Sequence, residues 1–131
     1  MSYDLGLTYP KSGEFIELDE PHHLKGGRPC LGGCPTAEYN ITSNYTEHFC
    51  RVFFDRVSNH PMAKDGVLSG IRTIYGLTGR ESIPILLAAI DQLGDDRDPD
   101  YWKATDGNVK RALQDCLILA SRCLWGVWDG D

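Results

Sequence analysis

The sequence predicts an α+β fold in which a small N-terminal antiparallel sheet packs on a helical C-terminal part. Three observations lead to this prediction. Residues 3–7, 15–18 and 39–45 resemble strands, the segments after residue 46 carry apolar residues at helical spacing, and glycine and proline separate the two kinds of pattern. The 131 residues are the length of one ordinary domain, so residues 1–131 are expected to form a single domain.

The N-terminal strands are predicted from alternation and turn composition. Residues 3–7 alternate apolar and other side chains, and residues 8–14 hold Pro10 and Gly13. Residues 15–18 are then the return strand of a β-hairpin, and residues 39–45 complete a sheet of about three strands. The glycine-rich segment between them, residues 19–35, is open to two interpretations, a plain connection or a loop that covers a site.

Four helical segments are predicted in the second half of the chain. Asn44 and Glu47 resemble a capping box before a helix whose core stripe runs to Val57, and Gly76 ends a second helix over residues 65–75. A capping box at Thr78 begins the third. The last begins at Thr105 and has the clearest periodicity, which predicts a buried stripe containing Leu113, Leu117 and Ala120.

Composition and charge exclude several classes of function. A net charge of −6 argues against binding to duplex nucleic acid or to an anionic membrane surface. The N-terminus has no signal-peptide pattern and no run of about 20 apolar residues exists, so a cytoplasmic location is expected. In that compartment all five cysteines are expected to be free thiols.

Metal and catalytic chemistries find little support in the spacing of residues. Zinc ligands could come from Cys30, Cys34 and nearby histidines, but one loop Cys pair falls short of a tetrahedral set. The acidic run from Asp96 lacks the glycine and glutamate of a calcium loop. A Cys–His nucleophile and a carboxylate-pair hydrolase have no diagnostic spacing. The prediction is therefore no metal and no cofactor.

Two kinds of ligand site remain. The helix starts at Thr78 and Thr105 offer free N–H groups for phosphate or carboxylate, with Arg80, Lys110 or Arg111 adding charge, although ordinary capping explains both. The strand 39–45 places Asn40, Thr42 and Asn44 on one polar face. These residues could bind a ligand or hold the glycine-rich loop of residues 26–33, and both alternatives stay open.

Several segments resemble a family of small, uncharacterised proteins of bacteriophages and bacterial genomes. The resemblance covers nearly the whole chain and is carried by residues 1–4, 17–22, 26–27, 39–42, 70–79, 101–105, 107–108 and 126–131. Where members of this family are Thr-rich, near Gly32 and Gly33, this chain has Cys30 and Cys34. The resemblance implies a cytoplasmic accessory protein that binds a host factor or a small signalling nucleotide, by analogy with phage proteins of this size.

The sequence therefore predicts a non-catalytic binding module for a small polar or phosphorylated ligand, with an anti-defence role in which a phage accessory protein sequesters a nucleotide-type signal. The expected ligand-binding residues combine the polar strand, arginines and helix starts: Tyr39, Asn40, Thr42, Asn44, Arg51, Arg72, Thr78, Arg80 and Asn108. The alternatives are a protein–protein interaction module that inhibits a host protein through its acidic surface, and a small hydrolase. A homo-oligomer is also left open.

Overall fold

The fold is built around a three-stranded antiparallel sheet, seen in a computed structural model that describes residues 2–28 and 30–131. Strand β1 (Ser2–Thr8) lies in the middle, between β4 (Glu38–Thr42) and β7 (Val127–Gly130). Leu5 and Leu7 of β1 are fully buried, because this central strand is covered by the helices. The α+β prediction is confirmed.

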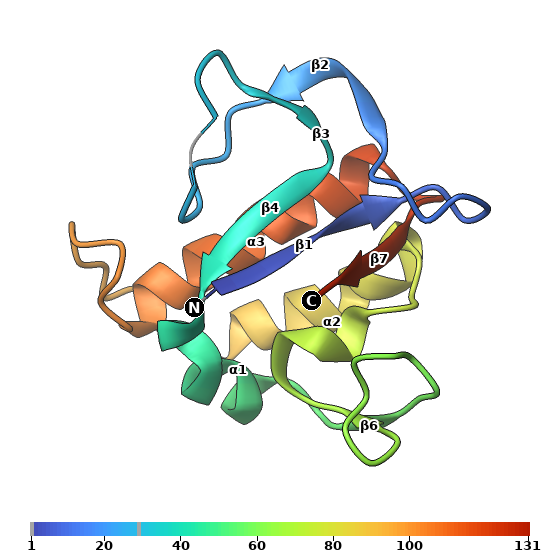
Figure 1. Cartoon of the computed structure of the whole chain (residues 1–131). Helices are drawn as coiled ribbons and strands as arrows, with labels where there is room; N and C mark the ends of the chain where they lie inside the picture. Colours follow the sequence, from blue (N-terminus) through green and yellow to red (C-terminus); the bar gives the residue numbers. More distant parts are fainter. Residues whose placement is uncertain (1, 29) are drawn as a thin grey trace.

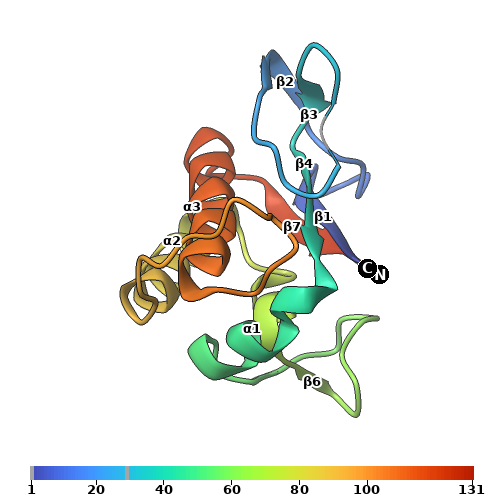
Figure 2. The same ribbon diagram turned by 90° about the vertical axis from the view of Figure 1, so that its left-hand side faces the viewer.

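Two long helices cover one face of this sheet, as Figures 1 and 2 show. They are α2 (Gly79–Asp91) and α3 (Asp106–Arg122), which pack against each other. Thr78 forms the predicted capping box with Glu81, and the Thr105 side chain caps α3. Among the described residues, no helix has the length and apolar character needed to cross a membrane.

The buried face of α3 is wider than the predicted stripe. Leu113 and Ala120 are fully buried as predicted, whereas Leu117 is only partly buried. Leu119, which the stripe leaves out, is fully buried. Since α3 packs against α2 as well as β1, it buries residues on more than one side.

The predicted pairing of residues 15–18 with residues 3–7 as a hairpin was wrong beyond the isolated bridge between Thr8 and Phe15. Residues 15–18 approach β1 only at the turn, where the Ile16 N–H donates to the Leu7 carbonyl at 2.9 Å. The chain then enters β2 (Glu17–His22), which pairs with β3 (Cys34–Thr36) in a separate two-stranded sheet. The C-terminal β7 takes the place beside β1, and it buries the Trp128 ring completely while Trp125 stays half exposed.

Two predicted helices were also corrected. After β4 the chain forms a short 3₁₀ turn (Ser43–Tyr45) and then α1 (Thr46–Val52), which ends before Val57. Thr42 rather than Asn44 caps this turn. Residues 56–57 and 67–68 form the small antiparallel pair β5 (Arg56–Val57) and β6 (Val67–Leu68). Only a 3₁₀ helix over Gly70–Ile74 remains of the expected helix 65–75, although Gly76 does adopt a positive φ of 86°.

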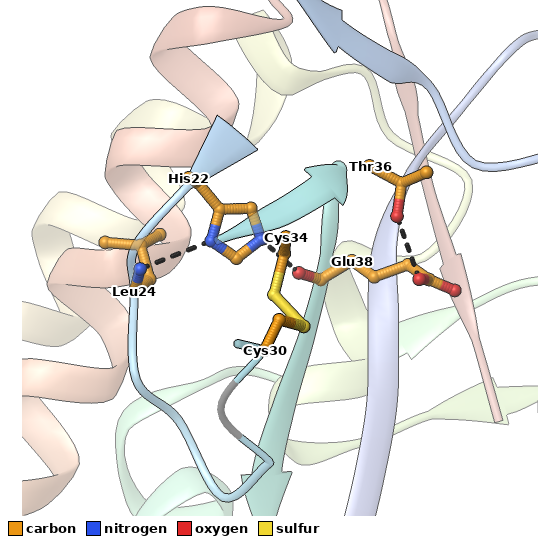
Figure 3. The surroundings of a disulfide bond; sticks show 6 residues. All are labelled: His22, Leu24, Cys30, Cys34, Thr36 and Glu38. Carbon is orange, nitrogen blue, oxygen red and sulfur yellow. Dashed lines mark hydrogen bonds between the residues drawn. A yellow bond between two sulfur atoms is a disulfide. The ribbon is translucent and has the colours of Figure 1, made fainter. Parts of the chain in front are cut away.

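The expectation of five free thiols was wrong, because Cys30 and Cys34 form a disulfide (Figure 3). Their Cα atoms are 5.2 Å apart, an ordinary separation for such a bond. Figure 3 also shows His22, whose ring lies between the Leu24 N–H and the Glu38 carbonyl oxygen. Its Nδ1 accepts from Leu24, so its Nε2 donates to Glu38 at 2.7 Å, and burial lowers its pKa. This neutral histidine ties the end of β2 to the start of β4.

Candidate functional site

The polar face of β4 is turned toward the protein itself. Asn40 is 8% exposed, and its amide donates to the Asp4 carboxylate at 2.6 Å and to the Ser2 hydroxyl at 2.9 Å. The Thr42 hydroxyl accepts the Asn44 N–H at 3.2 Å, and the Asn44 amide donates to the Trp102 carbonyl at 2.9 Å. These three predicted ligand residues therefore use much of their bonding capacity on neighbouring segments.

The glycine-rich loop lies directly on β4. The Gly27 N–H donates to the Asn40 carbonyl at 2.9 Å. At Gly26, where φ is +49°, a Cβ atom would lie 2.4 Å from that same carbonyl oxygen. Only glycine permits both this φ and this approach. This part of the loop is thus held against the strand by the Asn40 main chain, whereas the side chains of Asn40, Thr42 and Asn44 bond other segments.

The predicted arginines are distributed over the molecule. Arg51 donates to the Asp106 carboxylate at 2.8 Å, and Arg72 lies over the Tyr3 ring with its guanidinium carbon 4.9 Å from the centroid. Thr78 and Arg80 lie at the start of α2, where Gly126, Leu124 and Thr78 itself accept the first four N–H groups of the helix. That helix start therefore has no free N–H group in its first turn for an anion.

A cavity of about 560 Å³ lies beside the loop and β4, and it contains two of the predicted residues, Tyr39 and Asn108. It is bounded by the glycine-rich loop, β4, the 3₁₀ turn that follows, the segment before α3 and the first half of α3. Its lining is completed by Lys25, Gly26, Tyr45, Arg97, Asp98, Pro99, Tyr101, Arg111, Ala112 and Asp115. The volume is in the range of sites that enclose small molecules.

A tyrosine–carboxylate pair is part of the cavity wall. The Tyr39 hydroxyl donates to Oδ2 of Asp115 at 2.5 Å, across 76 positions of sequence. Burial raises the pKa of Asp115, against the opposing effects of the Tyr39 hydrogen bond and of Arg111 and Arg97. Burial and the neighbouring carboxylate raise the pKa of Tyr39 as well, so its phenol stays protonated and acts as the donor. The Tyr39 hydrogen bond therefore fixes the Asp115 carboxylate, a hydrogen-bond acceptor, in the cavity wall.

Three cationic side chains surround the same cavity. Lys25, Arg97 and Arg111 are exposed, and within residues 2–28 and 30–131 none of their side chains makes a hydrogen bond or an ion pair. By contrast, the nearby Lys110 ammonium binds the Asp95 carboxylate at 2.7 Å. In a chain with net charge −6, three unpaired cations therefore gather at one opening, beside the carboxylates of Asp98 and Asp115.

Arg97 and Asp115 line the cavity but were not among the residues predicted from the sequence. The i, i+4 spacing of Arg111 and Asp115 indicates one shared helix face, but it is equally typical of a solvated face. What distinguishes Asp115 is its contact with Tyr39 of β4, which no local pattern predicts. Within the described part of the chain, no group of three His, Cys, Asp or Glu residues is arranged to hold a metal ion.

Comparison of the chain with protein-family models, with curated proteins and with solved structures gives no match. The chemistry of the cavity therefore follows from its own geometry.

Proposed function

We propose that the protein is a non-catalytic binding module for a small anionic ligand, a phosphorylated compound of the nucleotide type, held in the cavity around Tyr39 and Asn108. The observation that carries the proposal is the group of unpaired cations, Lys25, Arg97 and Arg111, around an open cavity that the Tyr101 ring lines. Guanidinium groups bind phosphate in a fixed, bidentate geometry.

The walls of the cavity support a ligand that also has a flat apolar part. Tyr101 is the partly exposed ring of this lining, and the fully buried Tyr45 ring supports it with its centroid 5.7 Å away. The Tyr101 hydroxyl accepts the Thr42 N–H at 3.0 Å, so the ring is fixed before a ligand enters. For a phage accessory protein, such a site would sequester a nucleotide-type signal.

Thermal unfolding in the presence of nucleoside monophosphates tests the proposal. A ligand at about 100 times its Kd stabilises the folded state by about 2.7 kcal/mol, which is a clear rise in Tm. We expect this rise for wild type and its loss in Arg111→Gln. Arg80→Gln is the matched control, because it removes the same charge at an exposed position outside the cavity. Recovery of the intact nucleotide by mass spectrometry checks that binding occurs without turnover.

Two results would contradict the proposal. One is a flat response of the wild type to every nucleotide tested, which would favour the protein–protein interaction module instead. The other is an equal loss of the Tm rise in Arg80→Gln and Arg111→Gln, which would assign the effect to overall charge rather than to the cavity.

A further inference from the structure

The polar side chains that line the cavity differ in how many of their hydrogen-bonding atoms are still without a partner. The Asn108 side chain accepts the Asp98 N–H at 3.0 Å and donates to the carbonyls of Asp100 and Lys103 at 3.0 and 2.9 Å. The Asp98 carboxylate accepts the Asp100 N–H at 2.9 Å and lies 3.4 Å from the Lys103 ammonium. Both side chains are engaged in shaping the loop before α3 and have little to offer a ligand.

Asp115 is different, because only one of its two oxygens is engaged. Tyr39 donates to Oδ2, and no hydrogen bond joins Oδ1 to another described residue. The side chain is half buried and lines the cavity. The cavity thus offers one hydrogen-bond acceptor of fixed position on its wall, together with the cationic donors Lys25, Arg97 and Arg111.

We propose that the ligand is a nucleotide whose base carries an exocyclic amino group, which donates an N–H to Oδ1 of Asp115 while its phosphate binds Arg97 and Arg111. This inference rests on the proposed function, since it places the base and the phosphate in the same cavity. It goes further because it predicts that nucleotides whose base has an exocyclic amino group bind more tightly than those whose base has none.

The charges around Asp115 favour a neutral donor over a cationic amine. Lys25, Arg97 and Arg111 outnumber the two carboxylates of the lining, Asp98 and Asp115, so an ammonium group entering the cavity would meet a net positive charge. An exocyclic amino group of adenine, guanine or cytosine donates a hydrogen bond without carrying a charge. The base is planar, and the partly exposed ring of Tyr101 offers a surface on which it would lie.

Calorimetric titration of the whole chain with two matched pairs of nucleotides tests this inference. The pairs are AMP against purine riboside 5′-monophosphate, and GMP against IMP, and the members of each pair differ by one amino group. We expect the amino-bearing member of at least one pair to bind at least about tenfold more tightly, the usual effect of a hydrogen bond to a charged group.

Two variants test whether Asp115 causes the preference for the amino-bearing nucleotide and whether Arg111 binds the phosphate. Asp115→Asn is close in shape, and its amide nitrogen would face the ligand if its oxygen accepts from Tyr39, so the preference should fall to within about twofold. Arg111→Gln should weaken both members of a pair by a similar factor and keep their ratio. Thermal unfolding of each variant without ligand checks that it is folded.

The outcomes separate this inference from the proposed function. Equal affinities within both pairs in wild type, with binding still lost in Arg111→Gln, would overturn the role of the amino group and leave the anion site standing. An unchanged preference in Asp115→Asn would overturn the role of Asp115. No binding of any of the four nucleotides to wild type would overturn both.

Discussion

The Asp115 carboxylate is partly buried, and burial of its charge lowers the free energy of unfolding. Burial raises its pKa above the ordinary value of 3.8, so the folded chain holds this proton more tightly than the unfolded chain does. Its contribution to stability is therefore fully present below the unfolded pKa and is lost as pH rises through the folded pKa. Asp115 therefore stabilises the fold less when it is ionised than when it is protonated.

We expect Asp115→Asn to be more stable than wild type at pH 7, because the amide keeps an acceptor for Tyr39 and removes the buried charge. The difference should shrink as pH falls through the raised folded-state pKa of Asp115, because the wild-type carboxyl then becomes protonated. Urea denaturation at several pH values measures it. A variant less stable than wild type at pH 7, with no dependence on pH, would show that the charge is well solvated in the fold.

Asn40 is expected to act through stability. Its amide joins β4 to Ser2 and Asp4 of β1, and it is almost fully buried. Asn40→Ala should lower the free energy of unfolding by about 1–3 kcal/mol, the usual cost of leaving buried polar groups without partners. Asn59→Ala, at an exposed position, should stay within about 0.5 kcal/mol. Loss of ligand binding in Asn40→Ala with unchanged stability would restore the original hypothesis of a polar ligand-binding face.

At the scale of helices and strands, the sequence predicted the helix starts that depend on neighbouring residues, and it missed a strand that depends on a distant partner. Thr78 and Thr105 mark the starts of α2 and α3, because capping depends on residues three positions apart. Strand β7 was not predicted, since Trp128 and its neighbours become a strand only by pairing with β1. The segment 65–75 has helical periodicity but holds Gly70 at a φ of +61°, which a regular helix excludes.

The corrected burial of α3 has a measurable consequence. Leu119 is fully buried and Leu117 only partly, although the periodic stripe favours Leu117. Leu119→Ala should cost about 2–5 kcal/mol of unfolding free energy, and Leu117→Ala distinctly less. The midpoints of chemical denaturation compare the two directly. A larger loss for Leu117→Ala would show that α3 is rotated relative to the sheet.

The disulfide stabilises one element, the loop between β2 and β3. Cys30 and Cys34 are separated by four positions, so the closed loop is short. Loop-closure entropy for such a loop gives a stabilisation of about 2 kcal/mol. Denaturation with and without a reducing agent should show this difference in wild type, and Cys50→Ser, which removes an exposed free thiol, should behave alike. Equal stability with and without the reductant would contradict the prediction.

At the scale of the whole molecule, the fold explains why only part of the site could be predicted. Tyr39 and Asn108 are conspicuous in the sequence, one on a strand and one at a helix start, and both reach the cavity. Asp115 becomes a site residue only when α3 packs behind β4 and brings it to the Tyr39 hydroxyl. Arg51 and Arg72 were equally plausible in the sequence, yet tertiary contacts pair them with Asp106 and with the Tyr3 ring.

An NMR titration of the ¹⁵N-labelled chain with AMP locates the ligand on the protein. We expect the backbone signals that shift most to belong to the cavity, including Gly26, Arg97, Asn108 and Asp115. Signals of Thr78 and Arg80, at the start of α2 outside this cavity, should stay in place. Shifts concentrated at the start of α2, or no shifts at all at millimolar AMP, would contradict this expectation.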